Sequence, residues 1–182
     1  MTSTGVVAMK KTIFQGEYFV SKDSNLVIST ILGSCVAACL FDPVARIGGM
    51  NHFLLPGDQG GRSTPANDYL GVHLMELLIN GLLREGAERD RLVAKLFGGA
   101  RTIQGLSDIG GRNAEFAQKF LEREGIMLQP GSVGGLLGRR IEFSPTTGRV
   151  RQSFMNASDP EYRRASTPKA VPQIKSGDLE LF

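Results

Sequence analysis

Both cysteines and one of the two histidines of the chain lie in a single stretch, ILGSCVAACLFDPVARIGGMNHFLLP, at residues 31–56. Cys35 follows Gly33 and Ser34 at a break between two apolar runs, and His52 lies in the next apolar segment. A free thiol has a pKa of about 8.5, so it needs a neighbouring base to act as a nucleophile at neutral pH. The pattern makes Cys35 a candidate nucleophile and His52 its candidate base.

Four interpretations of Cys35 compete. A small buried hydrophobe is the commonest role of a free cysteine, and we adopt it for Cys39, which lies inside the apolar run VAACLF. A redox sensor needs a resolving partner, and Cys39 is poorly placed to serve as one. The remaining interpretations are a zinc site shared with Cys39, His52 and His73, and a nucleophile.

Strand geometry argues against the zinc site. If residues 36–42 form a strand, positions four apart are separated by roughly 13 Å, whereas a Zn–S bond is about 2.3 Å long. Cys35 and Cys39 then cannot share one ion, and the same distance excludes a disulfide between them. The zinc interpretation survives only if the segment is helical. We therefore expect no metal and no organic cofactor.

The nucleophile interpretation requires the two residues to meet. If Cys35 begins one strand and His52 lies in the next antiparallel strand, the chain returns to the same neighbourhood. Glycines precede both residues and would let the backbone of a substrate approach closely. We take Gly33, Ser34 and Gly49 as candidate substrate-binding residues.

The rest of the pattern predicts one layered α/β domain, with a mixed, largely antiparallel sheet flanked by two main helices. The predicted strands are 10–20, 25–32, 36–42, 46–56, 91–100, 126–129, 139–145 and 148–155, the last two forming a hairpin around PTTG. Short turns join the strands between residues 25 and 56, so we expect these strands to pair with one another. One helix is predicted from a cap at Asn67 or Asp68 to Gly86, and another over 113–124.

The chain of 182 residues is 41% hydrophobic, which is enough for one core. We predict a flexible N-terminus at 1–10, a folded domain at 11–156 and a disordered tail at 157–182. The tail ends in GDLELF, which is acidic and aliphatic. Two interpretations of this hexapeptide stay open: a docking motif anchored by its leucines and Phe182, or a segment that packs back onto its own domain.

Composition excludes several classes of protein. The formal charge of +3 is only mildly basic, and the arginines are scattered rather than interleaved with aromatic residues, so we expect no nucleic-acid partner. The N-terminus lacks the pattern of a secretory signal, and no run approaches the roughly 18 apolar residues that cross a bilayer. Two cysteines do not form a disulfide framework. We expect a cytoplasmic protein without membrane insertion.

Several motifs resemble one known family. LGSCVAACLFDPVARIGGMNHFLLP is similar to the signature of the CheD proteins, the chemoreceptor glutamine deamidases of bacterial chemotaxis, and FQGEYFV, KLFGGA, IGGRNAEF and GRRIEF with TGRV add to the likeness. Together these motifs cover roughly residues 11–152 in the order of the family. The resemblance implies a hydrolase that converts particular glutamine side chains of methyl-accepting receptors to glutamate and releases ammonia.

The resemblance also implies the roles of the site residues. The cysteine of the GSC motif, here Cys35, is the nucleophile, and His52 is its partner. A hydroxyl residue six positions before the cysteine completes the triad, and that position holds Ser29, followed by Thr30. Neighbours along a strand point to opposite faces, so only one of them can face the histidine. We expect Ser29 in this role, with Thr30 as the alternative.

Two kinds of partner follow from the resemblance. Methyl-accepting receptors are the expected protein substrate, and in some members of the family a CheC-type phosphatase is bound and stimulated. A non-catalytic adaptor is therefore the alternative function, although the presence of both Cys35 and His52 favours an enzyme. Strand alternation points Asn51 away from the site, towards solvent or a turn. His73 is expected on the surface of the first helix.

Overall fold

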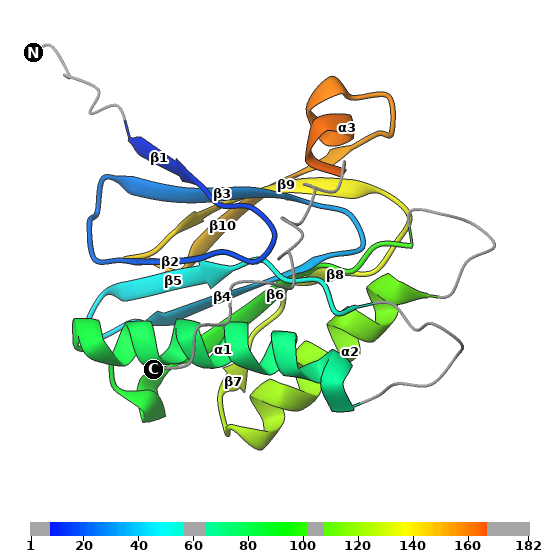
Figure 1. Cartoon of the computed structure of the whole chain (residues 1–182). Helices are drawn as coiled ribbons and strands as arrows, with labels where there is room; N and C mark the ends of the chain where they lie inside the picture. The colour runs from blue at the N-terminus through cyan, green and yellow to red at the C-terminus, as the bar shows by residue number, and fades with distance from the viewer. Residues whose placement is uncertain (1–7, 57–64, 102–107, 167–182) are drawn as a thin grey trace, which may run out of the picture.

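The computed structural model describes residues 8–56, 65–101 and 108–166. Two β-sheets pack face to face, and helices α1 (Pro65–Glu85) and α2 (Ile109–Arg123) cover the outer face of one of them (Figure 1). A short helix, α3 (Pro160–Ser166), lies beside the other sheet. No helix within these residues is long and apolar enough to span a bilayer.

The first sheet has four strands. Their spatial order is β1 (Met9–Thr12), β3 (Leu26–Leu32), β9 (Gly138–Ser144) and β10 (Arg149–Met155). The β1–β3 pair is parallel and the others are antiparallel. The hairpin predicted around PTTG is confirmed, because β9 and β10 pair directly across that turn, with Ser144 opposite Arg149.

The second sheet has six strands. Five of them follow the order β2 (Tyr18–Ser21), β5 (Ile47–Asn51), β4 (Val36–Asp42), β6 (Val93–Gly98) and β7 (Met127–Leu128), and β8 (Ser132–Val133) also pairs with β6. The β6–β7 and β6–β8 pairs are parallel, and the other pairs are antiparallel. The predicted α/β class, with mixed and largely antiparallel pairing, is confirmed, although the strands divide between two sheets. A short 3₁₀ turn at Arg89–Arg91 precedes β6.

Strand β4 separates two apolar cores, and all seven of its residues are buried. Val36, Ala38 and Leu40 face the core under α1 and α2. Ala37 and Cys39 face the core between the sheets, together with residues of the opposite sheet. A strand that is covered on both faces needs a continuous apolar run, which is the pattern of VAACLF.

The single strand predicted at 10–20 is wrong. Residues 9–12 and 18–21 form two strands in different sheets. Between them the chain makes a tight turn in which Glu17 N–H donates to Phe14 O at 3.0 Å, and Gly16 has a positive φ of 85°. Glycine adopts this conformation without the steric cost that a side chain would add.

The pairing predicted for the strands between 25 and 56 is confirmed for β4 and β5 and is wrong for β3. Strands β4 and β5 form the expected antiparallel pair, but β3 pairs with β1 and β9 in the other sheet. The break at Gly33 and Ser34 is therefore a crossing from one sheet to the other. Cys35 lies at this crossing, immediately before β4.

Both predicted helices exist, with earlier starts. Helix α1 begins at Pro65, ahead of the predicted cap, and proline is well suited to a first helical turn. It ends before Gly86, whose φ is 108°, as predicted. Helix α2 begins after Asp108, whose side chain accepts a hydrogen bond from Gly111 N–H at 2.9 Å, and it ends before Gly125.

The predicted termini are more ordered than expected where the structure describes them. Strand β1 includes Met9 and Lys10 from the segment predicted as flexible. Helix α3 falls inside the predicted tail, and its Tyr162 is buried with the ring against Gly138. Residues 1–7, 57–64, 102–107 and 167–182, the last range including the GDLELF hexapeptide, lie outside the described residues.

Asp42 fixes the turn that follows β4. Its buried carboxylate accepts hydrogen bonds from the backbone N–H groups of Val44 (2.9 Å), Ala45 (3.0 Å) and Glu88 (2.9 Å), and it pairs with the Arg91 guanidinium at 2.8 Å. Burial raises the pKa of this carboxyl, but the hydrogen bonds from Arg91 and the backbone outweigh burial and hold the pKa well below its ordinary value. One side chain thus ties the β4–β5 turn to the segment before β6.

Replacement of Asp42 by alanine should lower the free energy of unfolding by roughly 2 to 4 kcal/mol, because buried backbone donors and a guanidinium lose their acceptor. Urea denaturation measures this loss. The folded-state pKa is depressed, so the contribution is complete above the unfolded pKa of about 3.9 and is lost as the pH falls through the folded pKa. Asp42→Asn should weaken this acid dependence. Equal stability of wild type and Asp42→Ala would contradict the assignment.

Candidate active site

Backbone contacts from β6 and the segment after it hold the crossing that carries Cys35. Gly99 N–H donates to Cys35 O at 2.7 Å, and Ala100 N–H donates to Gly33 O at 2.9 Å. Gly98 has a positive φ of 103°, and any Cβ there would collide with the Cys35 carbonyl oxygen. The glycines of the KLFGGA motif therefore allow the end of β6 to pack directly against the backbone of the cysteine.

Cys35 and His52 lie on the same face of the six-stranded sheet. Val36 and Phe53 exchange two backbone hydrogen bonds, of 3.0 and 2.9 Å, and this bridge continues the β4–β5 register. His52 then lies opposite Ala37, so Cys35 and His52 are diagonal neighbours across the two strands. Their face is the one that packs against the four-stranded sheet.

The opposite sheet supplies the partner of the histidine. Thr30 Oγ1 lies 2.8 Å from His52 Nδ1, and both residues are buried. Along β3, Ile28, Thr30 and Leu32 share the face towards the core between the sheets, so Ser29 points the other way. The hydrogen bond that we expected from Ser29 is made by the alternative, Thr30.

The hydrogen bonds around Thr30 define the tautomer of His52. The Thr30 hydroxyl donates to Ile13 O at 2.8 Å, so its oxygen is left to accept a hydrogen bond from Nδ1–H of the imidazole. This assignment follows from the hydrogen-bond network and leaves the lone pair on Nε2. His52 Nε2 is buried without a hydrogen-bond partner among the residues that the structure describes. Such a nitrogen is suited to accept a proton.

Burial keeps both groups neutral at rest. It raises the pKa of the Cys35 thiol to about 12, against a smaller lowering by the residue's own backbone N–H, and it lowers the pKa of His52 to about 4. The thiol is half-buried and donates a long hydrogen bond, of 3.7 Å, to the carboxamide oxygen of Gln15. It does not donate to His52 Nε2 in this conformation.

Asn113 is a positioning residue that sequence reasoning missed. Its fully buried side chain donates to Ser34 O at 2.8 Å and accepts from Leu55 N–H at 3.1 Å. One amide in α2 thereby binds the residue before Cys35 and the strand segment that follows His52. The available signal was a polar residue on the apolar stripe of the helix, in the IGGRNAEF motif.

Asn51 corrects a second expectation. Its side chain points away from the cysteine, as predicted, but it is fully buried rather than near solvent or in a turn. The amide accepts from Ala38 N–H at 3.0 Å and donates to Leu74 O at 3.3 Å. Asn51 therefore joins β5 to β4 and to helix α1, on the face opposite His52.

The remaining candidates fall in different places. Gly33 and Ser34 are half-buried beside Cys35. Gly49 is buried, and a Cβ there would collide with Leu78 of α1, so the structure places it in the helix-covered core and not beside the thiol. Cys39 is fully buried, as predicted.

Two further expectations concern His73 and the zinc site. His73 is exposed on α1, as expected. Within the described ranges, no three His, Cys, Asp or Glu side chains lie together in a way that could hold a metal ion.

Comparisons of the sequence with known proteins match this chain to one family. A sequence model of CheD, described as CheD chemotactic sensory transduction, matches residues 54–153. A relative from Rhizobium etli is 59% identical over 182 residues, covering 96% of this chain and 97% of its own length. Relatives from Caulobacter sp. and Agrobacterium fabrum are each 53% identical over 177 residues, covering 96% of this chain and 94% and 97% of their own lengths.

All three relatives are named probable chemoreceptor glutamine deamidase CheD. Among solved structures, a Neisseria meningitidis protein of the DUF152 family superposes loosely, with a TM-score of 0.41 and 11% identity over 65% of this chain and 53% of that chain.

Nitrogen NMR of the imidazole tests the tautomer. We expect His52 to be protonated on Nδ1 at pH 7 and to titrate with a pKa of about 4. Because this pKa lies below the unfolded value of about 6.5, neutral His52 contributes stability above that pH, and the contribution is lost as the pH falls through the folded pKa. Thr30→Val should shift the proton towards Nε2. A dominant Nε2–H form in the wild type would refute the assignment.

Thiol alkylation tests the role of Asn113. Asn113→Ala removes both bonds that hold the Ser34 and Leu55 backbones, so we expect the alkylation rate of Cys35 by iodoacetamide to change several-fold at pH 8. The matched control is Asn80→Ala, which changes an exposed asparagine of α1. Both rates are measured at a temperature where circular dichroism shows each variant folded. Unchanged alkylation in a folded Asn113→Ala protein would remove Asn113 from the positioning residues.

Proposed function

Because the chain belongs to the CheD family, we propose that it deamidates glutamine side chains of chemoreceptors, with Cys35 as the nucleophile and His52 as the general base. The names of the relatives support the substrate. The observation that carries the mechanism is the hydrogen-bond chain from Ile13 O through Thr30 to His52, which leaves Nε2 as the basic nitrogen on the face that also bears Cys35.

In the proposed reaction, the Cys35 side chain rotates away from Gln15 towards His52. Nε2 takes the thiol proton while the sulfur attacks the carboxamide carbon of the substrate glutamine. The imidazolium then gives its proton to the departing nitrogen, and ammonia leaves a thioester on Cys35. A water molecule, deprotonated by the same imidazole, hydrolyses the thioester to glutamate and restores the thiol.

Backbone groups beside the thiol are suited to hold the developing oxyanion. Within the described part of the chain, the N–H groups of Ser34 and Cys35 donate to no other residue. The carbonyl groups of Gly33, Ser34 and Cys35 each accept a hydrogen bond, from Ala100, Asn113 and Gly99, so the peptide planes of this turn are fixed. Preorganised donors of this kind stabilise charge that appears only in the transition state.

The contact with Gln15 supports access for a carboxamide. Its side-chain oxygen lies 3.7 Å from Cys35 Sγ, so the surface of the protein already accommodates an amide beside the thiol. Gln15 is exposed, so it can leave when the glutamine of a receptor takes this position. An exposed entrance also suits a substrate whose glutamine lies on a folded protein.

The two opposed pKa shifts fit this sequence of events. Burial penalises a thiolate alone and an imidazolium alone, but an adjacent pair of opposite charges compensates part of that penalty. Proton transfer is therefore favourable only when the sulfur has turned towards Nε2 and attacks the carboxamide carbon of the substrate. Binding of a CheC-type phosphatase and a cytoplasmic location stay predictions from the resemblance.

The test is intact-mass analysis of a receptor cytoplasmic fragment from the same organism, with peptide mapping to locate each amide-to-acid change. Wild type should convert particular glutamines, and Cys35→Ala should convert none. Thr30→Val should lower kcat about 10- to 100-fold, because the imidazole loses the partner that fixes its tautomer. Ser29→Ala is the matched control and should keep nearly full activity. Conversion by Cys35→Ala at the wild-type rate would overturn the proposed nucleophile.

A further inference from the structure

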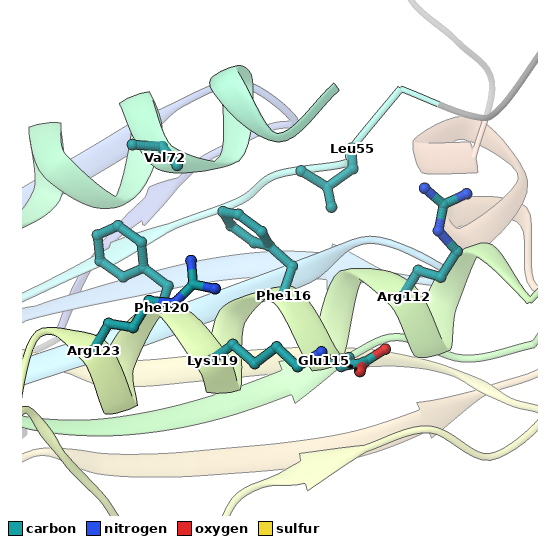
Figure 2. A pocket seen from close by; sticks show the side chains of 8 residues that line it. All are labelled: Leu55, Val72, Arg112, Glu115, Phe116, Lys119, Phe120 and Arg123. Carbon is teal, nitrogen blue, oxygen red and sulfur yellow. Dashed lines mark hydrogen bonds and ion pairs between the residues drawn. The ribbon is translucent and has the colours of Figure 1, made fainter. Parts of the chain in front are cut away.

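A groove lies on the outer surface between α1 and α2, away from the core between the sheets. Its volume is about 360 Å³ (Figure 2). Four apolar side chains form its floor, and the figure shows the two phenylalanines of α2 pointing towards α1. These floor residues are Leu55, Val72, Phe116 and Phe120. We call this feature the α1–α2 groove.

The absence of a side chain at Gly71 shapes the floor. A Cβ there would collide with the Phe116 ring and with Leu55, so α1 approaches α2 closely at this point. Phe116 packs edge-on against the buried Phe53 ring at a centroid distance of 5.8 Å. Val72 is 38% exposed, so part of the apolar floor faces solvent.

The rim of the groove is mainly cationic. Arg112, Lys119 and Arg123 project from α2 along one side, with Glu115 as the single acidic residue among them. Glu115 is paired with Lys119 at 2.6 Å. An apolar floor beside a rim of net positive charge favours a ligand that combines aliphatic side chains with carboxylates.

We propose that the α1–α2 groove binds residues 177–182 of the same chain, the hexapeptide GDLELF. In an extended segment alternate side chains point to opposite sides, so Asp178 and Glu180 share one side while Leu179 and Leu181 share the other. The two leucines match the apolar floor, and the two carboxylates match the cationic rim.

Residues 167–176 join the hexapeptide to helix α3, which ends at Ser166. Ten extended residues reach roughly 33 Å. This reach exceeds the separation of about 10 Å between the two stacked sheets, which lie between α3 and the helices that form the groove (Figure 1). Attachment to the same chain also raises the effective concentration of the hexapeptide to about the millimolar range, so a weak contact suffices.

The α1–α2 groove and the candidate active site share helix α2 and Leu55. Helix α2 supplies both the cationic rim and Asn113, which binds the Ser34 backbone next to Cys35. Leu55 belongs to the floor, and its N–H is the second partner of Asn113. The occupied groove would therefore stabilise the helix that positions the nucleophile. The binding itself is independent of the proposed reaction.

Amide NMR on the full-length protein tests the proposal. The tail variant carries Leu179→Asp and Leu181→Asp, and we expect its amide shifts to differ from wild type at Val72 and along residues 112–123. A synthetic peptide of residues 174–182, added to the tail variant, should restore the wild-type shifts saturably, and its affinity should fall several-fold at high salt. Identical spectra for wild type and tail variant, or differences confined to other surfaces, would overturn the proposal.

A charge exchange provides the specific control. Arg123→Glu should reduce the groove shifts, and adding Glu180→Lys to that variant should recover them. Arg149→Glu changes the charge equally on β10 of the other sheet, where the arginine is exposed, and should leave the groove shifts unchanged. Groove shifts that depend on protein concentration would show the hexapeptide of a second copy in the groove and would contradict the intramolecular contact.

Discussion

The hydrogen bond between Thr30 and His52 crosses from one sheet to the other, and the candidate site depends on it. A separation of 2.8 Å between two buried side chains requires the two sheets to be held at a fixed spacing and register. The apolar residues around it provide this constraint: Ile28 and Leu32 flank Thr30 on one sheet, and Met50 lies beside the histidine on the other. A close-packed core fixes such spacings well, because small changes in volume are costly.

The helices constrain the same site from the opposite direction. Asn113 of α2 donates to Ser34 O, and Gly98 and Gly99 bring the end of β6 against the Cys35 carbonyl. Cys35 therefore lies on a short crossing that is fixed by β6 and α2.

Sequence patterns predicted the local elements well and the relations between sheets poorly. The apolar run at 36–42 predicted the buried strand, and Gly86 predicted the end of α1. Both features depend on residues close in sequence. To choose between Ser29 and Thr30, one must know which face of β3 is turned towards His52. The chain crosses between sheets at Gly33, so the alternation of side chains in β4 does not continue into β3 and cannot show which face of β3 meets His52. The contacts of Asn113 could not be predicted either, because its partners are distant in sequence.

The identity of the third residue explains the resting state of the site. A buried carboxylate beside an imidazole stabilises the imidazolium and raises its pKa. Thr30 offers only a neutral hydroxyl, so burial dominates and lowers the pKa of His52 to about 4, while the Cys35 thiol stays protonated with a pKa of about 12. Because thiolates rather than thiols are readily oxidised, a buried and protonated Cys35 thiol is protected from oxidation in the resting state.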